Sequence, residues 1–326
     1  MRRLAILFSV LLLLVGCSRE TASHTRNFFA MDTVMSVTVY DANCEAQTQQ
    51  AVQIVQELED QLAVTDETSA IWQLNTTGEA ELSDDAAELL RRSLQLKEET
   101  GGAFDPTIYN IVKMWGFTTG SYQVPTEAEI ADALAEHQSG TITLEGNHAA
   151  VSGCAVDLGA VAKGYTAAKI AESLSEVDGL NLSLGGNVQL EGTKPDGSLW
   201  RVGIKNPENT DENLGILELE SGAVVTSGGY ERYFEQDGVR YCHIIDPRTG
   251  YPADAGLISV TIVSEDGFLA DALSTALYVM GLEDATKFWA GRHDFEAVLV
   301  TEDGGVYVTE GLKDSFYGCE FTVMMR

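Results

Sequence analysis

The second half of the chain is built from short β-type runs, separated by Gly, Asn and Asp, and only a few helical patterns interrupt them. Helices and strands therefore do not alternate strictly, which argues against a doubly wound parallel sheet and predicts an α+β fold with mainly antiparallel sheets and packed helices. The predicted strands are 180–184, 200–204, 216–219, 224–226, 239–245, 257–263, 296–300, 305–308 and 320–324, with helices at 268–280 and 283–290.

The first half carries clearer helical signals. Apolar residues at helical spacing predict a helix over 44–63, Ser83 opens another to about 99, and a capping box from Thr126 to Glu129 opens a third to about 137. Residues 157–175 predict a loop that leads into a helix, and strands are predicted at 28–40, 141–144 and 149–151. There is no repeat or obvious linker after residue 28, so residues 28–326 are predicted to form a single domain.

The N-terminus has the pattern of a bacterial export signal. Two arginines precede an apolar stretch over 4–15 that is too short to span a bilayer comfortably. The run Leu14-Val15-Gly16-Cys17 resembles a lipobox, in which the cysteine is diacylated and becomes the mature N-terminus. We expect a lipoprotein signal peptide over 1–16, a lipidated linker over 17–27, and a chain that is lipid-anchored to the cell membrane on its extracytoplasmic face.

The chain is strongly acidic, with a formal net charge of −30. Such a surface repels nucleic acid and anionic lipid, so we do not expect the chain to bind DNA or RNA. An anionic ligand would need local positive charge or a metal ion.

Four cysteines remain if Cys17 is lipidated: Cys44, Cys154, Cys242 and Cys319. Their spacing predicts neither a zinc site nor a dense disulfide framework, although disulfides are permitted outside the cytoplasm. We favour a buried core position for Cys242 over a catalytic role.

The region 241–275 holds the most informative polar residues. His243 precedes a turn rich in Pro and Gly, and Asp271 and Thr275 stand four residues apart, which places them on one face of a helix. Their oxygen ligands suit Mg²⁺ better than zinc or copper. Each residue also has an ordinary interpretation, since strand histidines are often structural and an Asp–Thr pair is often only a helix face.

Other segments are weaker signals. The run from Val156 to Tyr165 places an acid, small residues and Lys163 ahead of a helix, where free backbone N–H groups can bind phosphate, or it is an ordinary helix start with a solvated lysine. The Gly-Gly pairs within 183–187 and 226–230 have two interpretations. They either line the entrance of a ligand-binding cleft or form tight hairpin turns. Nucleotide-binding glycine motifs after a strand and the GxSxG motif are absent from the sequence, so Rossmann, P-loop and α/β-hydrolase hypotheses lack support.

Seven motifs, taken in order, resemble the ApbE family, the Mg²⁺-dependent FAD:protein FMN transferases, across nearly the whole chain after the signal peptide. They are the segments 30–33 (AMDT), 69–75 (SAIWQLN), 102–107 (GAFDPT), 156–164 (VDLGAVAKG), 184–187 (LGGN), 243–252 (HIIDPRTGYP) and 270–275 (ADALST). In this family FMN passes from FAD to a threonine or serine hydroxyl of a target protein, and AMP is released.

The resemblance implies specific roles for residues of this chain. His243 would be the general base and Asp271 a catalytic metal ligand. Mg²⁺ would be held by the side chains of Asp271 and Thr275 and the backbone carbonyl of Ala160. The FAD site would be lined by Met31, Trp72, Ala103, Phe104, Asp105, Asp157, Lys163 and Ile245. The acceptors would be flavoprotein subunits of membrane redox complexes, of the Na⁺-pumping NADH:quinone reductase or Rnf type.

Three alternatives stay open at this point. Water could replace the protein hydroxyl, which would make the chain an FAD pyrophosphatase that releases FMN and AMP. The chain could also bind FAD without catalysis, as a lipoprotein that stores or delivers it. A solute-binding lipoprotein would show two similar α/β lobes, and the sequence pattern does not indicate them.

Overall fold

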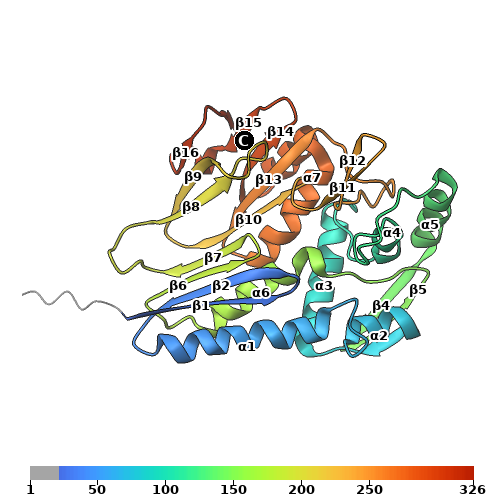
Figure 1. The fold of residues 1–326 in the computed structure, drawn as a ribbon, viewed down its shortest axis with the longest axis horizontal. Helices are drawn as coiled ribbons and strands as arrows, with labels where there is room; N and C mark the ends of the chain where they lie inside the picture. Colours follow the sequence, from blue (N-terminus) through green and yellow to red (C-terminus); the bar gives the residue numbers. More distant parts are fainter. Residues whose placement is uncertain (1–21) are drawn as a thin grey trace, which may run out of the picture.

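The computed structural model describes residues 22–326, and its largest element is a nine-stranded sheet (Figure 1). Neighbouring strands are antiparallel except for the last pair, β15 and β17, which is parallel. This confirms the prediction of a mixed fold with mainly antiparallel sheets. In spatial order the strands are β1 (Ser23–Ala30), β2 (Thr33–Tyr40), β6 (Gly179–Leu184), β7 (Asn187–Gly192), β10 (Gly222–Gly228), β13 (Leu257–Ser264), β14 (Glu296–Thr301), β15 (Val306–Thr309) and β17 (Thr322–Met324).

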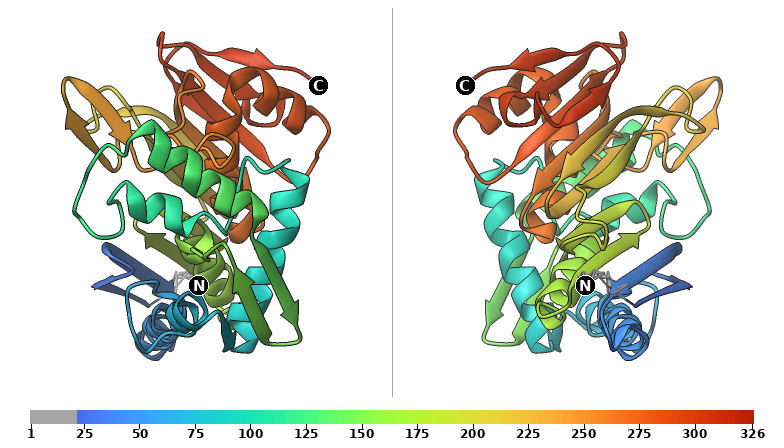
Figure 2. Two further views of the ribbon diagram at one scale, coloured as in Figure 1. Left: turned by 90° about the vertical axis from the view of Figure 1, so that its right-hand side faces the viewer. Right: turned by 90° about the vertical axis from the view of Figure 1, so that its left-hand side faces the viewer.

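Three smaller sheets and the helices complete the fold. The small sheets are β3 (Glu79–Glu81) with β5 (His148–Ser152) and β4 (Thr141–Glu145), β16 (Phe316–Gly318) with β9 (Asn213–Leu219) and β8 (Trp200–Lys205), and the hairpin of β11 (Tyr233–Gln236) and β12 (Val239–Cys242). The helices are α1 (Cys44–Leu62), α2 (Ala70–Thr77), α3 (Asp84–Glu99), α4 (Tyr109–Met114), α5 (Glu127–Ser139), α6 (Gly159–Ser173) and α7 (Gly267–Ala290), with a 3₁₀ turn at Glu310–Leu312. Figure 2 shows α1 at one end of the molecule and β14 and β15 at the other. Within residues 22–326, the structure contains no helix with the length and apolar character needed to cross a bilayer.

The N-terminal strand prediction is wrong in one respect. Residues 28–40 form the end of β1, a turn and then β2, because the chain reverses at Met31 and Asp32, whose φ angles are 47° and 59°. The predicted linker is also too long, since β1 begins at Ser23 and pairs with β2 along its whole length. The predicted signal peptide and Cys17 lie outside the described residues.

The predicted strand 239–245 is also too long. Strand β12 ends at Cys242, after which Ile244 and Ile245 enter the core and Asp246 begins a turn, closed by a 2.8 Å hydrogen bond from the Gly250 N–H to the Asp246 carbonyl. His243 therefore lies just beyond the strand. Cys242 is buried in the core as predicted, and all four cysteines of the described part are unpaired.

Several short elements escaped prediction, among them α2, α4, β3, β7, β11 and β16. Their hydrophobic periodicity spans too few residues to distinguish them from loops. The longer helices start where predicted: the Ser83 hydroxyl accepts a hydrogen bond from the Ala86 N–H, and Thr126 with Glu129 forms the complete capping box of α5.

Helix α7 is buried on nearly all sides, as expected for a helix that is apolar around its whole circumference. The side chain of Asp266 caps its N-terminus by accepting from the N–H groups of Phe268 and Leu269. The helix bends at Gly281, where φ is 77°, and this break explains why the sequence predicts two helices. A Cβ at Gly281 would lie 2.7 Å from the carbonyl oxygen of Ala255, so the bend brings α7 against a neighbouring loop.

Helices α6 and α7 pack with their backbones in direct contact at Gly164. A Cβ there would lie 2.2 Å from the Gly267 carbonyl oxygen and 2.5 Å from Asp271 Cβ, both of which are closer than real atoms approach. This packing holds the first two turns of α7 against the first two turns of α6. This packing also sets the positions of the side chains that α6 and α7 direct towards the candidate site.

We expect Gly164→Ala to lower the free energy of unfolding by about 1–3 kcal/mol, because the added methyl group meets backbone that cannot rotate away. The loss should occur even though alanine favours helix by about 1 kcal/mol over glycine. Urea unfolding measures it. Gly291→Ala is the matched control, because the nearest atom to its added Cβ is 3.7 Å away. Equal stability of the two variants would contradict the close packing of α6 on α7.

Candidate functional site

The carboxylate of Asp271 is buried at the contact between α6 and α7. Its Oδ2 accepts a 2.8 Å hydrogen bond from the backbone N–H of Gly164. In a regular helix the N–H of residue 164 points at the carbonyl of residue 160, four residues earlier. The Asp271 carboxylate therefore bonds the N–H that faces the Ala160 carbonyl in a regular helix, and a shared cation site of the two groups stays a prediction.

Burial raises the pKa of Asp271 above its ordinary value, against the opposing effects of Lys163, the Gly164 N–H and Asn187. Burial also raises the pKa of Asp157, which Lys163 and Arg232 oppose. Two carboxyl groups thus share Lys163 as a nearby positive charge. Three of the sequence-predicted residues are brought together here: Asp157, Lys163 and Asp271.

Thr275 lies one turn after Asp271 on α7 and is half-buried. Its Oγ1 is 3.4 Å from Ser227 Oγ on β10, and Ser227 Oγ is 2.7 Å from Ser274 Oγ. Ser274 in turn donates to the carbonyl oxygen of Asp271 at 2.7 Å. Hydroxyl groups therefore link the Thr275 side chain to the backbone carbonyl of Asp271.

These residues fit a hard divalent cation. A carboxylate can accept about four hydrogen bonds, yet buried Asp271 receives a single one of ordinary length, from Gly164, among residues 22–326. Such a group is unfavourable as an anion unless a cation neutralises it. The other two predicted ligands, the Thr275 hydroxyl and the Ala160 main-chain carbonyl, are oxygen atoms of the kind Mg²⁺ prefers. The Mg²⁺ ligand set itself stays a prediction.

His243 is half-buried beyond the end of β12, and its Nδ1 is 3.1 Å from the carbonyl oxygen of Arg232. A carbonyl only accepts hydrogen bonds, so Nδ1 carries the hydrogen and Nε2 has a free lone pair. Burial lowers the pKa of His243 to about 4, and the nearby charges of Arg232 and Lys163 act in the same direction, although the hydrogen bond to the Arg232 carbonyl opposes them. The imidazole is therefore neutral at pH 7 and able to accept a proton.

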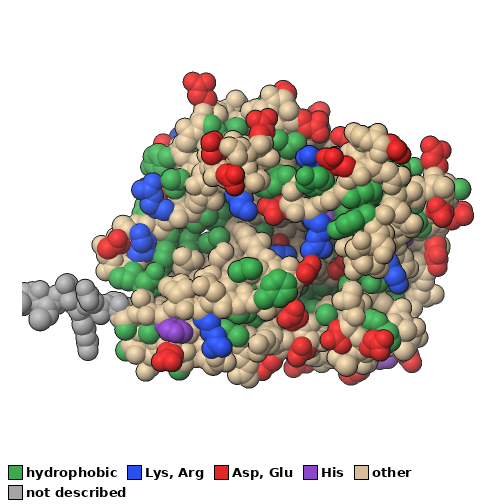
Figure 3. Space-filling view, viewed as in Figure 1, with side chains coloured by type: hydrophobic (Ala, Val, Ile, Leu, Met, Phe, Trp, Pro, Cys, Tyr) green, Lys and Arg blue, Asp and Glu red, His purple; other side chains and the backbone are tan. Residues whose placement is uncertain are grey.

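The tip of the β1–β2 hairpin closes one side of this region. Asp32 forms a 3.0 Å ion pair with Arg232, the residue whose carbonyl holds His243, and the Met31 N–H donates to Glu59 of α1 at 2.6 Å. In Figure 3 the visible face is hollowed near its middle, beside this tip, and acidic and basic side chains gather at the hollow. The predicted residue Met31 thus lies on the same side of the molecule as His243 through the Asp32–Arg232 pair.

Two distant segments meet beside Asp157. The Asp157 N–H donates to the Pro106 carbonyl at 2.8 Å, which joins the segment 103–107 to the start of α6. The Asn75 side chain of α2 bonds both the N–H and the carbonyl of Val156, at 2.7 Å each. Trp72 lies one turn before Asn75 on the same helix and is half-buried, so α2 carries it towards this junction.

The side chain of Asp105 is fully engaged inside the protein. It pairs with Lys97 at 2.8 Å and His137 at 3.1 Å, and it accepts from the N–H and hydroxyl of Thr107. Although burial alone would raise its pKa, these partners lower the pKa of Asp105 to about 2. Its carboxylate therefore positions the loop 103–107.

Three other residues predicted to line the FAD site have side chains in the core: Ala103, Phe104 and Ile245 are each less than 5% exposed. Their backbone remains available to a ligand. Contact of these residues with FAD stays a prediction.

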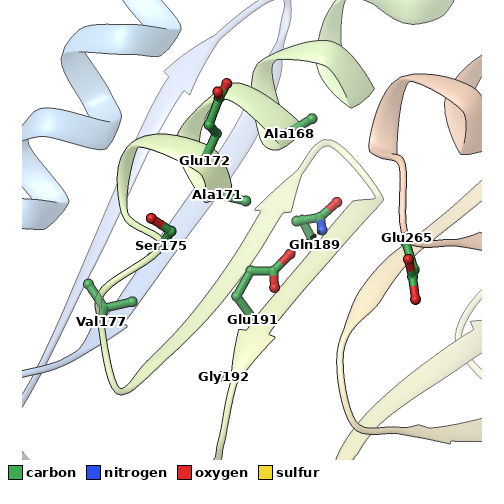
Figure 4. A pocket seen from close by; sticks show the side chains of 9 residues that line it. All are labelled: Ala168, Ala171, Glu172, Ser175, Val177, Gln189, Glu191, Gly192 and Glu265. Atoms are coloured by element: carbon green, nitrogen blue, oxygen red, sulfur yellow. Dashed lines mark hydrogen bonds between the residues drawn. The ribbon is translucent and has the colours of Figure 1, made fainter.

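A separate depression lies on the other side of α6 (Figure 4). It is lined by Ala168, Ala171, Glu172, Ser175, Val177, Gln189, Glu191, Gly192 and Glu265. The three glutamates do not converge on a common point in this view, and none of the sequence-predicted site residues lines it. It is therefore not the candidate site.

Sequence reasoning assigned no role to four residues that the structure places here: Arg232, Asn187, Ser227 and Ser274. Asn187 is 4% exposed, and its Nδ2 has no hydrogen-bond partner of ordinary length in the described part of the chain. Asn187, Ser227 and Ser274 belong to segments that stand out in the sequence, because each adjoins a Gly-Gly pair or the Asp–Thr pair. Arg232 has no such signal.

Known proteins resemble the chain over most of its length. A model of the ApbE family matches residues 31–299. The FAD:protein FMN transferase of Treponema pallidum is 31% identical over 341 aligned residues, which cover 96% of this chain and 94% of that protein. The FAD:protein FMN transferase of Klebsiella pneumoniae is 32% identical, covering 81% of this chain and 85% of that protein.

Solved structures agree with the described fold. The crystal structure of the ApbE protein from Thermotoga maritima has a TM-score of 0.83 and is 32% identical, covering 90% of this chain and 99% of that one. The flavin transferase ApbE from Vibrio cholerae has a TM-score of 0.80 and is 26% identical, with the same coverage.

Proposed function

The chain belongs to the ApbE family, and we propose that it is an FAD:protein FMN transferase that uses Mg²⁺ to move FMN from FAD to a threonine or serine hydroxyl of a target flavoprotein. The observation that carries this proposal is the convergence at Lys163. The charge of Lys163 opposes the rise that burial causes in the pKa values of Asp157 and Asp271, and it adds to the lowering that burial causes in the pKa of His243. This supports a site in which the residues proposed to hold the cation, a positive charge for phosphate and the proposed base lie near one another.

The acidic surface makes the local positive groups important. FAD carries a negatively charged pyrophosphate, and a chain with a net charge of −30 repels it unless the cleft is locally positive. Lys163 supplies one such charge from the second turn of α6. When bound, Mg²⁺ supplies further neutralisation of the charge that builds up on phosphate oxygens during phosphoryl transfer. Asp271, Thr275 and the Ala160 carbonyl would hold it.

His243 provides the proton acceptor. The acceptor hydroxyl forms a bond to the phosphorus of the FMN half of FAD, and the bond from that phosphorus to the bridging oxygen breaks, so that AMP leaves. The hydroxyl proton passes to Nε2 of His243, the nitrogen that the Arg232 carbonyl leaves unprotonated. A positioned base of this kind contributes roughly 10²–10⁴-fold to the rate.

Intact mass spectrometry tests the function. Residues 18–326 are incubated with FAD, Mg²⁺ and a threonine-containing fragment of the FMN-carrying subunit of a Na⁺-pumping NADH:quinone reductase. We expect the fragment to gain the mass of one FMN residue, with AMP released and no product in EDTA. Asp271→Asn, which removes the buried charge, should abolish the reaction.

The other outcomes decide between functions. Free FMN and AMP with an unmodified fragment would favour the FAD pyrophosphatase, and FAD retained intact would favour a binding protein. Wild-type turnover by Asp271→Asn would contradict the metal site.

His243→Ala should lower the rate of transfer by roughly 10²–10⁴-fold while FAD binding is kept, because the base is lost and the cleft is not. In the wild type, the rate of the bound complex should be flat from pH 5 to 8. It should fall as the pH drops through about 4, where the imidazole becomes protonated.

Single-turnover kinetics and FAD fluorescence measure the two effects. His148→Ala, at an exposed residue of strand β5, is the control and should behave as wild type. Unchanged transfer by His243→Ala would remove His243 from the mechanism.

The proposed site of action is the extracytoplasmic face of the cell membrane, where a lipid on Cys17 would tether the enzyme. The proposed acceptors are flavoprotein subunits of membrane redox complexes, of the Na⁺-pumping NADH:quinone reductase or Rnf type. A tether confines enzyme and acceptor to the same surface and raises their effective concentration.

Cys17→Ser should move the protein out of the membrane fraction of a bacterial host, because the thiol that would receive the diacylglyceryl group is lost. Immunoblots of membrane and soluble fractions measure the change. Cys44→Ser, at a buried cysteine of α1, is the control and should stay membrane-bound. Membrane attachment of the Cys17→Ser protein equal to wild type would argue against the lipid anchor.

A further inference from the structure

A chain of four oxygen atoms connects the backbone of α7 to the side chain of Thr275. Ser274 Oγ lies 2.7 Å from the carbonyl oxygen of Asp271, Ser227 Oγ lies 2.7 Å from Ser274 Oγ, and Thr275 Oγ1 lies 3.4 Å from Ser227 Oγ. Ser274 is completely buried, whereas Ser227 and Thr275 are half-buried. Ser227 comes from β10, so the chain of contacts also joins the sheet to the helix.

The direction of every hydrogen bond in this chain follows from its first member. The Asp271 carbonyl can only accept, so the single hydroxyl hydrogen of Ser274 points at it. Ser274 then has no hydrogen left for Ser227, and two hydroxyl oxygens 2.7 Å apart need a hydrogen between them. Ser227 must therefore donate to Ser274.

The direction of the contact between Ser227 and Thr275 follows in the same way. Because Ser227 has given its hydrogen to Ser274, its oxygen faces Thr275 as an acceptor. The Thr275 hydroxyl then directs its hydrogen towards Ser227, along the longest and weakest contact of the three. Its remaining lone pairs point away from Ser227.

We propose that Ser227 and Ser274 are positioning residues that fix the hydroxyl of Thr275 with its lone pairs turned towards the cation site. This inference rests on the proposed function, because it assumes that Thr275 is a ligand of Mg²⁺. A freely rotating hydroxyl would present its hydrogen to a cation in part of its orientations. The chain of contacts from the Asp271 carbonyl through Ser274 and Ser227 to Thr275, here called the relay, disfavours those orientations before the ion arrives.

The relay also ties the backbone of one proposed ligand residue to the side chain of the other. It starts on the backbone carbonyl of Asp271 and ends on the side chain of Thr275, one helical turn later. Mg²⁺ demands near-ideal octahedral geometry and has few protein ligands, so the orientation of each ligand matters more than it does for a cation with many. Partners behind the direct ligands commonly change metal affinity when they are removed.

The test is a titration of the protein with Mn²⁺ alone, which stands in for Mg²⁺, with free Mn²⁺ followed by electron paramagnetic resonance. We expect Ser227→Ala to weaken Mn²⁺ binding roughly tenfold. Ser227→Thr restores the hydroxyl and should return the affinity to near the wild-type value. Thermal unfolding of each variant checks that it is folded.

A matched control lies one residue earlier on β10. Thr226 Oγ1 forms a comparable 2.8 Å pair with Thr261 Oγ1, but successive side chains of a strand point to opposite faces, so this pair is outside the relay. Thr226→Val removes that hydroxyl and should leave Mn²⁺ affinity unchanged.

The variant Asp271→Asn separates this inference from the proposed function. If Asp271→Asn weakens Mn²⁺ binding and Ser227→Ala does not, the metal site stands and the relay is wrong. If wild type binds Mn²⁺ no better than Asp271→Asn, the metal site and the relay are both overturned. A loss in Thr226→Val as large as that in Ser227→Ala would also overturn the relay, because the effect would then be general to the strand.

Discussion

The contact of α6 with α7 at Gly164 is the constraint on which the candidate site depends. The two backbones approach so closely that any side chain at this position would overlap the Gly267 carbonyl. This closeness lets the Gly164 N–H reach the Asp271 carboxylate, which would otherwise be buried without any partner. One glycine therefore positions a carboxylate, a carbonyl from the first turn of α6 and, through α7, the hydroxyl of Thr275.

The electrostatics of the site oppose those of the molecule as a whole. The protein surface is strongly negative, yet half-buried Asp157 and buried Asp271 both have raised pKa values, so the folded chain disfavours further negative charge at this place. A site of this kind gains stability from a cation and, with Lys163, becomes compatible with an anionic ligand. The neutral state of His243 follows from the same surroundings, because burial and two nearby positive charges disfavour imidazolium.

The sequence predicts those parts of the fold whose signals are long or chemically distinct. The capping box at Thr126 and the periodic helix α1 were predictable because several residues in each point to the same structure. The reversal at Met31 and Asp32 was not, because residues other than glycine rarely adopt positive φ and no turn motif marks them. In the site, the pairing of Asp271 with Thr275 follows from helical spacing, whereas Arg232 acts through its backbone carbonyl, which every residue possesses.

The candidate base is held by the residue opposite it at the end of the β11–β12 hairpin. Tyr233 pairs with Cys242, so the same register places Arg232 opposite His243. Both the backbone N–H and the Nδ1–H of His243 donate to the Arg232 carbonyl, at 3.0 and 3.1 Å. A carbonyl oxygen has two lone pairs and can accept both bonds. The same carbonyl thus fixes the position of the residue, the orientation of its ring and the tautomer that leaves Nε2 free, while the Arg232 side chain holds the β1–β2 tip through Asp32.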